Sequence, residues 1–304
     1  MFTRAETDWC CRLVELAREE DLEPAGDLTS LAVIPAGMEG QAAFVARAKG
    51  IVAGLPAAQI AVAAIDCRLQ FQPVADIADG KLVQPGQPLA NVAGPMSGIL
   101  AAERMALNFL QHLSGIASLT RQYVDAIAGL PAQILDTRKT TPGWRLLEKY
   151  AVRQGGGHNH RFGLFDGILI KDNHLEALGI GREGIAQAVA AARDKVGESV
   201  PVEIEVDSLD QLDRALNCSP DIVLLDNMPP DLLREAVRRR NAAAPSILLE
   251  ASGGITLETV RDIARTGVDR ISVGALTHSA PALDIALDYR TMPKGKRQRT
   301  KRKT

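Results

Sequence analysis

From about residue 133 the chain alternates short apolar runs with amphipathic helical segments. The runs are rich in β-branched residues and Leu, and they cover 133–137, 167–171, 202–206, 222–226, 246–250 and 270–274. Strands that alternate with helices indicate βαβ units and a parallel sheet. Six repeats, with room for a seventh, predict a complete or partly open α/β barrel.

The first 115 residues have a different pattern, which predicts a mixed α/β region. Helical periodicity covers 9–18, and a β-like run follows at 41–46. Asp79-Gly80 and Pro85-Gly86 mark turns. A long helix is expected over 101–128, where Ser114-Gly115 could kink or end it. We therefore expect two domains, 1–115 and 116–276, the first completed by 277–292.

Charged residues recur where the apolar runs end. The charged residues are Asp136, Arg138 and Lys139, then Lys171 and Asp172, and then Glu205, Asp226 and Glu250, and the polar Thr137 lies within the first group. A strand buried on both faces gives no reason for a charge at its end, and the carboxyl ends of barrel strands form the catalytic face. Contact with solvent could explain one or two of these residues, but it explains the whole series poorly.

Several cations are expected to meet at that face: Arg138, Lys139, Arg161 and Lys171, with His160 beside them. Cations gathered in one pocket repel each other unless an anion binds there. Arg grips a carboxylate with two parallel hydrogen bonds, whereas Lys acts as a point charge. The set predicts a ligand with several carboxylates or phosphates. The alternative is that each cation forms an ordinary surface ion pair.

A glycine-rich turn, Ser252-Gly253-Gly254, follows the fifth run and precedes a helix expected over 256–266. Val273-Gly274-Ala275 closes the next run. Glycine-rich turns at helix N-termini present free N–H groups to phosphate, and barrels often bind phosphate after their last two strands. We expect a phosphate here; the alternative is a tight turn that needs glycine for its geometry.

Glu205 and Asp226 are the candidate magnesium ligands, and Glu203 lies on the same strand face as Glu205. Mg²⁺ takes one or two carboxylates together with water and substrate phosphates, and carboxylates also bind ribose hydroxyls. Charge balance with neighbouring cations is the alternative, and both can hold. His158-x-His160 could ligate a transition metal, but no Cys lies nearby, so an anion contact of His160 and a structural role of His158 are preferred.

The net charge, the cysteine content and the apolar stretches restrict the expected partners and cellular location. The segment 294–303 holds seven basic residues and no acid, so removing it from the net charge of −2 leaves −9 on the remainder. We expect 293–304 to be a disordered tail, and nucleic acid to be a partner only through it. Four cysteines without paired spacing fit a reducing cytoplasm. The most apolar stretch, 51–65, is too short to span a bilayer.

Several segments of the sequence strongly resemble the quinolinate phosphoribosyltransferase family. The central matches are DTRKTTPG (136–143), EKYAVRQGGG (148–157), NHR (159–161), LIKDNH (169–174), EIEVD (203–207), LLDN (224–227), EASGG (250–254) and VGALTH (273–278). GDLT (26–29) and AERMALN (102–108) extend the match into the first domain. The resemblance covers about 20–290 and excludes the tail.

The resemblance implies an N-terminal α/β sandwich domain, an open seven-stranded α/β barrel, and a homodimer in which Arg104 reaches the partner's site. It implies that the quinolinate carboxylates contact Arg104, Arg138, His160, Arg161 and Lys171. The phosphoribosyl pyrophosphate side would be lined by Lys139, Glu205, Asp226, Ser252, Gly253, Gly254 and Gly274. Thr137, Val273 and Ala275 complete the predicted substrate contacts. Catalysis is expected from Lys139, Lys171, Glu205 and Asp226.

The reaction that the resemblance implies is quinolinate plus phosphoribosyl pyrophosphate to nicotinate mononucleotide, CO₂ and pyrophosphate. Mg²⁺ is the expected cofactor, with no prosthetic group. Two alternatives stay open: a phosphoribosyltransferase for nicotinate or another acid, and a phosphate-binding or regulatory barrel that the basic tail could tether to nucleic acid. A related group associated with molybdenum transport shares this fold and parts of the Arg-Lys and glycine-rich motifs. LIKDNH (169–174) looks more like the quinolinate enzymes than that last group.

Overall fold

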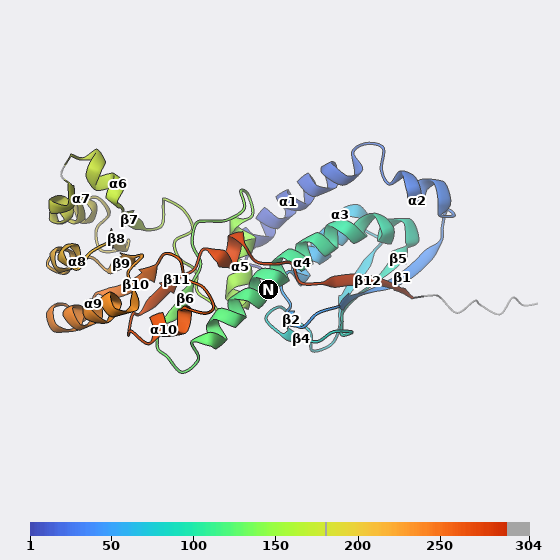
Figure 1. Ribbon diagram of the computed structural model, residues 1–304. Helices are drawn as coiled ribbons and strands as arrows, with labels where there is room; N and C mark the ends of the chain where they lie inside the picture. The colour runs from blue at the N-terminus through green and yellow to red at the C-terminus, as the bar shows by residue number, and fades with distance from the viewer. Residues whose placement is uncertain (180, 291–304) are drawn as a thin grey trace, which may run out of the picture. The chain divides into compact units, whose positions relative to one another are not determined.

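The computed structural model describes residues 1–179 and 181–290 of the chain (Figure 1). It divides into two compact units: Met1–Ser114 with the chain from Ala282 onward, and Gly115–Pro281. The basic tail expected over 293–304 lies outside the described residues.

The first unit contains a four-stranded antiparallel sheet in the order β12-β1-β5-β3. Its strands are β1 (Glu39–Ala46), β3 (Gln70–Pro73), β5 (Pro88–Pro95) and β12 (Ile285–Arg290). A short pair, β2 (Gly50–Ile51) and β4 (Leu82–Val83), stands apart. The helices are α1 (Arg4–Leu22), α2 (Leu28–Val33) and α3 (Leu55–Ile65). The helix expected at 9–18 and the strand expected at 41–46 are confirmed.

Helix α4 (Met96–Ala126) contributes its first part to one unit and its last part to the other. It continues through Ser114-Gly115, so this pair does not end the helix. The buried Ser114 hydroxyl accepts from Ala53 N at 2.9 Å and donates to Ala53 O at 3.0 Å. Ser114 thus satisfies the backbone of a neighbouring segment instead of competing with its own helix.

The second unit is built on a parallel sheet in the order β6-β11-β10-β9-β8-β7. Its strands are β6 (Gln133–Leu135), β7 (Ile168–Ile170), β8 (Val202–Val206), β9 (Ile222–Asp226), β10 (Leu248–Ser252) and β11 (Arg270–Ser272). On the free side of β6, a single parallel bridge joins Leu135 to His158, so the sheet of the described residues has six strands and one further bridge. The predicted α/β class with a parallel sheet is confirmed.

Helices connect the parallel strands, as the alternating pattern predicted. They are α5 (Arg145–Gln154), α6 (Asp172–Ala177), the 3₁₀ turn η1 (Gly181–Gly184), α7 (Ile185–Val196), α8 (Leu209–Leu216), α9 (Pro230–Ala243), α10 (Val260–Ala264) and α11 (Ala275–His278). Figure 1 shows α7, α8 and α9 side by side along the sheet, and the contacts between successive helices agree. Each covers one face of its strands with apolar residues, and β8 and β9 are buried along almost their whole length.

Several expected boundaries differ from the structure. The runs at 133–137, 167–171 and 270–274 form strands only over Gln133–Leu135, Ile168–Ile170 and Arg270–Ser272, and the helix expected over 101–128 is Met96–Ala126. The run at 246–250 forms a strand two residues later, so Glu250 lies in the middle of β10 and Ser252 ends it. The helix expected over 256–266 is shorter, since α10 begins at Val260. The Thr259 hydroxyl accepts from Thr256 N at 3.0 Å and bonds Thr256 O at 3.3 Å, which favours a turn before the helix.

In the described part of the chain no helix combines the length and the apolar character needed to cross a bilayer. All four cysteines are free thiols. Cys10 is buried within the first unit, and burial raises the pKa of its thiol to about 12, so it behaves as a small apolar side chain.

Candidate functional site

The carboxyl ends of the parallel strands bring the predicted side chains to one edge of the sheet. Ser252 pairs with Asp226 in the β9–β10 ladder, and Glu205 pairs with Leu224 in the β8–β9 ladder. Val273 follows β11 and donates its N–H to Leu135 O at 2.9 Å, just before Thr137 and Arg138. Because parallel strands end at a common edge, segments far apart in sequence meet there.

Arg138 lies close enough to Arg161 to disfavour the charge of Arg161. Burial and, next, the Arg138 guanidinium lower the pKa of Arg161. The Nε of Arg138 is buried and has no hydrogen-bond partner among the described residues. Arg161 donates from one Nη to Gly167 O at 3.0 Å, across the gap between the His158 segment and β7. Two neighbouring guanidinium groups, one with an unpaired buried donor, form a site for an anion.

Lys171 and Glu205, which the sequence assigned to different substrates, form an ion pair. The Lys171 Nζ donates to Glu205 Oε2 at 2.6 Å, and the Lys side chain is 43% exposed. Charge balance is therefore part of the role of Glu205 in the structure, as the alternative interpretation held. An anion bound beside Lys171 would compete with the Glu205 carboxylate for the Lys171 ammonium group.

A cavity of about 180 Å³ opens beside this pair. Carboxylates dominate its lining: Asp172, Glu176, Glu205, Asp207 and Asp226. Asp226 accepts from the amide of Asn227 at 2.8 Å through one oxygen. Oxygen ligands and a space that also admits water suit Mg²⁺. The residues present thus fit a magnesium ion held at Glu205 and Asp226.

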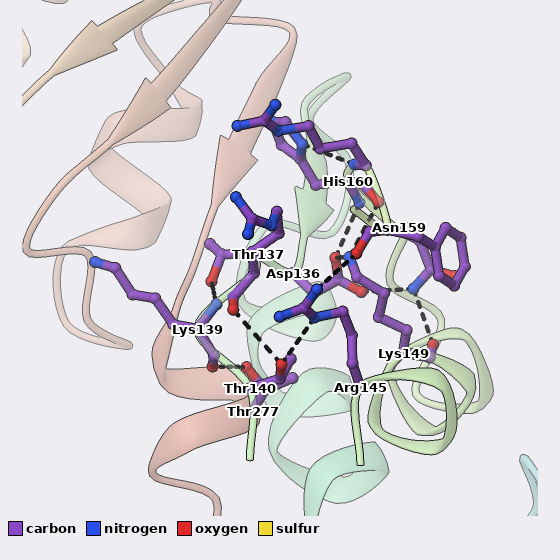
Figure 2. A network of polar contacts seen from close by, with 12 residues as sticks. Asp136, Thr137, Lys139, Thr140, Arg145, Lys149, Asn159, His160 and Thr277 are labelled. Atoms are coloured by element: carbon purple, nitrogen blue, oxygen red, sulfur yellow. Dashed lines mark hydrogen bonds and ion pairs between the residues drawn. The ribbon is translucent and has the colours of Figure 1, made fainter. Parts of the chain in front are cut away.

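Lys139 is anchored by its backbone, and its side chain extends away from the polar network (Figure 2). Its N–H donates to Thr137 Oγ1 at 3.0 Å, and its carbonyl accepts from Thr277 Oγ1 at 2.7 Å. A Cβ added to Gly274 would lie 3.1 Å from Lys139 Cδ. Gly274 therefore leaves room for the Lys139 chain, and Ala275 begins α11 directly after it.

The glycine-rich turn after β10 is shaped by its neighbours. Gly253 has φ +93°, and an added Cβ would lie 2.2 Å from Asn227 Oδ1. Gly254 has φ +60° and open space at its Cβ position. Because α10 begins only at Val260 and is short, the expected helix N-terminus is not at this turn. Any phosphate contact must come from the turn itself and from Ser252.

His160 occupies the sheet interior with both ring nitrogens engaged. Its Nε2 lies 3.1 Å from Glu203 and 3.3 Å from Glu250, and its Nδ1 accepts from Arg161 N at 2.8 Å. Burial alone would lower the pKa of His160, but hydrogen bonds to the two carboxylates outweigh it and raise the pKa to about 9. Burial also raises the pKa of Glu203. Because Nδ1 accepts a hydrogen bond, it carries no proton, and the proton of the cluster lies between Nε2 and the two carboxylates.

Glu250 is the clearest correction to the strand-end argument. It is fully buried, and its carboxylate also contacts Arg270 Nε at 2.7 Å. His160, Glu203 and Glu250 form the one group of possible metal ligands within 4.8 Å of each other in the described residues. Arg270 already balances one carboxylate, and the exposed His158 is outside the group. The His158-x-His160 pair is thus not brought together as a metal site.

Asp136 and Lys149 form an ion pair that sequence reasoning missed, and both side chains are completely buried. Burial raises the pKa of Asp136 and lowers that of Lys149, so both charges depend on the contacts around them. Lys149 stands within the matched segment 148–157, but nothing in a local pattern marks a helical Lys as buried. Arg104, in the first unit, is exposed on α4, as expected of a helix-surface residue.

Comparisons with known proteins identify the family of the chain. The family description "Quinolinate phosphoribosyl transferase, N-terminal domain" matches residues 27–114, and "Quinolinate phosphoribosyl transferase, C-terminal domain" matches residues 116–288. The chain belongs to the quinolinate phosphoribosyltransferase family.

Relatives in this family are similar over nearly the whole chain. The nicotinate-nucleotide pyrophosphorylase [carboxylating] of Mycobacterium leprae is 45% identical over 95% of this chain and 100% of its own. The probable enzyme of the same name in Bacillus subtilis is 43% identical over 86% and 88%. The nicotinate-nucleotide pyrophosphorylase structure from Francisella tularensis is 38% identical and covers 93% and 97%, with a TM-score of 0.85.

Proposed function

We propose that this quinolinate phosphoribosyltransferase joins quinolinate to phosphoribosyl pyrophosphate and releases pyrophosphate and CO₂, forming nicotinate mononucleotide for NAD biosynthesis. The observation that carries the proposal is the pair Arg138 and Arg161, two neighbouring cations, of which Arg138 has a buried Nε–H without a hydrogen-bond partner among the described residues. A planar ring with two adjacent carboxylates offers each guanidinium a partner.

On the quinolinate side the proposal assigns Arg138, Arg161 and Lys171, with Thr137 and His160 beside them and Arg104 from a partner subunit. The Lys171–Glu205 ion pair at 2.6 Å supports a shared role. When a carboxylate binds Lys171, Glu205 is released toward the ribose. The binding of quinolinate thus frees the Glu205 carboxylate to bind the ribose of phosphoribosyl pyrophosphate.

On the phosphoribosyl side the proposal assigns Lys139, Glu205, Asp226, Ser252, Gly253, Gly254, Val273, Gly274 and Ala275. Glu205 and Asp226 would hold Mg²⁺, which supplies charge neutralisation for the pyrophosphate when bound. Lys139 places a positive charge where negative charge builds on the departing pyrophosphate. Glu205 and Asp226 also orient the ribose hydroxyls.

The reaction steps follow from how the two substrates are placed relative to each other. The ring nitrogen's lone pair forms a bond to the anomeric carbon while the bond to pyrophosphate breaks, through an oxocarbenium-like state. The C2–carboxylate bond breaks next, and its electron pair stays on C2, stabilised by the adjacent cationic nitrogen until C2 takes a proton. The substrate is its own electron sink, so positioning and charge placement carry the catalysis.

The reaction can be tested directly by the release of CO₂ from carboxyl-labelled quinolinate. We expect release only with phosphoribosyl pyrophosphate present and with Mg²⁺ available, and loss of release after chelation because the pyrophosphate charge is no longer neutralised. Nicotinate offered in place of quinolinate should give no nucleotide. Nucleotide formation from nicotinate without CO₂ would instead establish a different acid as substrate.

The partner-subunit role of Arg104 predicts complementation between two inactive variants. Arg104→Ala and Lys171→Ala should each have little activity alone. Co-expressed and assembled at random, half of the dimers are mixed, and each mixed dimer has one intact site, so about a quarter of wild-type activity should return. Activity no higher than the mean of the separate variants would show that Arg104 does not cross to a partner.

A further inference from the structure

Helix α5 presents a basic face made of Arg145, Lys149 and Arg153. These residues are spaced four apart, so they lie on one side of the helix. Arg145 donates from Nε to Thr140 Oγ1 and from one Nη to Phe162 O, each at 3.0 Å. A single side chain thus joins the segment after Arg138 to the segment after Arg161.

One turn further along α5, Lys149 also joins the Arg138 segment to the Arg161 segment. It forms the buried ion pair with Asp136 and donates to His160 O at 3.0 Å (Figure 2). Asp136 in turn accepts from His160 N at 2.9 Å and from the Asn159 amide at 2.5 Å. Arg153 donates to Asn159 Oδ1 at 2.6 Å.

The two segments have little else to hold them at a fixed distance. Among the described residues the sheet joins them through one bridge, Leu135 to His158, with the bonds His158 N to Ile134 O and Asp136 N to His158 O. Beyond that bridge there is no ladder. The separation of Arg138 and Arg161 is therefore set by side chains of α5 and by Asp136, together with the contacts of His160 with Glu203 and Glu250.

We propose that α5 is a positioning element for substrate choice: Arg145 and the Asp136–Lys149 pair hold the Arg138 and Arg161 segments at the separation that fits two adjacent carboxylates. The inference rests on the proposed function, which assigns both arginines to quinolinate. Two guanidinium groups repel each other, so without this frame the segments would relax apart. A monocarboxylate needs only one of the two and is insensitive to their spacing.

The test compares equilibrium binding of quinolinate and of nicotinate to the full chain without phosphoribosyl pyrophosphate. Arg145→Met keeps the length of the stem and removes both hydrogen bonds. Arg145 is partly exposed, so water can reach the groups that it leaves. We expect the quinolinate Kd to rise at least tenfold and the nicotinate Kd to change less than twofold. Arg145→Lys should not rescue the binding, because one ammonium on a flexible stem does not reproduce the planar fork.

The matched control is Arg240→Met. Arg240 also bridges two segments, since one Nη donates to Ile247 O at 2.6 Å and to Asp269 at 2.7 Å. Those residues directly precede β10 and β11, at the opposite end of the strands. The control should lower Tm and leave the quinolinate Kd within twofold. An unchanged quinolinate Kd in folded Arg145→Met, or an equal rise for both acids, overturns the inference.

A second variant tests the buried pair. Asp136→Asn combined with Lys149→Met removes both charges together, which avoids a lone buried charge and keeps the chain foldable. It should lose quinolinate binding and keep the KM of phosphoribosyl pyrophosphate. Arg138→Ala and Arg161→Ala, measured in parallel, distinguish the positioning role of α5 from the assignment of the two arginines to quinolinate. If they weaken quinolinate binding while the α5 variants do not, only the positioning role fails; if they have no effect, the assigned site itself is wrong.

Discussion

Replacing Arg138 with Ala should raise the KM of quinolinate about 100-fold while the protein keeps its fold. A guanidinium that grips a carboxylate makes charge-assisted hydrogen bonds worth about 1.5–3 kcal/mol each. A loss near 3 kcal/mol corresponds to roughly a hundredfold in affinity. The KM of phosphoribosyl pyrophosphate should stay within about twofold, since the phosphate contacts are assigned to other loops.

The fold should tolerate this change for a specific reason. The Arg138 Nε has no hydrogen-bond partner among the described residues, so its removal strands no protein group there. The change also removes a charge that lowers the pKa of Arg161. Tm should therefore hold or rise slightly, which thermal unfolding would record beside the kinetics.

Two comparison variants sharpen the Arg138 result. Arg138→Lys keeps the charge without the fork, and its KM should fall between wild type and Ala. Arg265→Ala removes an exposed guanidinium that pairs with Asp262 at 3.0 Å on the surface, and its kinetics should match wild type. A quinolinate KM for Arg138→Ala near the wild-type value would remove Arg138 from the site.

The sequence located the strands best where both faces are buried. The runs at 202–206 and 222–226 have the bounds of β8 and β9. In β9, Ile, Val and Leu repeat without a break up to Asp226, whereas in β8 Val and Ile alternate with Glu203 and Glu205. Once those bounds are right, the parallel arrangement by itself places Glu205 and Asp226 at one edge. Polar residues at strand ends are therefore an informative signal when strand order is known.

The same reasoning failed at Glu250 for a definable reason. A charged residue was taken to end its strand, but Glu250 is balanced inside the sheet by Arg270 and His160, which come from segments distant in sequence. Lys149 is a similar case: its partner Asp136 lies in another element, so helical periodicity could not mark it as buried. Buried charges depend on tertiary partners, and local pattern does not report those.

The interior cluster also changes how His160 is understood. Sequence reasoning placed it against the substrate, yet in the structure its ring nitrogens are occupied by the Arg161 backbone and by Glu203 and Glu250. Its contact with quinolinate stays a prediction. The arrangement adds a second means, besides α5, of fixing the backbone that carries Arg161.

Replacing Lys139 with Ala should lower kcat for CO₂ release by about 10²–10³ and leave the quinolinate Kd nearly unchanged. Removing one preorganised charge or donor from a developing anion typically costs about 2.7–4 kcal/mol of transition-state stabilisation. The loss should appear in single-turnover experiments at saturating substrate, because the charge on pyrophosphate grows only as its bond to the anomeric carbon breaks.

The Lys139 backbone should stay in place in this variant. Its N–H bond to Thr137 Oγ1 and its carbonyl bond from Thr277 Oγ1 do not involve the side chain, and the ammonium has no ion pair in the described residues. Gly274→Ala provides an independent check: its Cβ would press on Lys139 Cδ at 3.1 Å and displace the chain, so kcat should fall in the same direction by less. If Lys139→Ala turns over within twofold of wild type, the charge facing the leaving group must come from another residue. The effect of Gly274→Ala would then trace to His278, because the added Cβ also lies 3.1 Å from His278 Nε2.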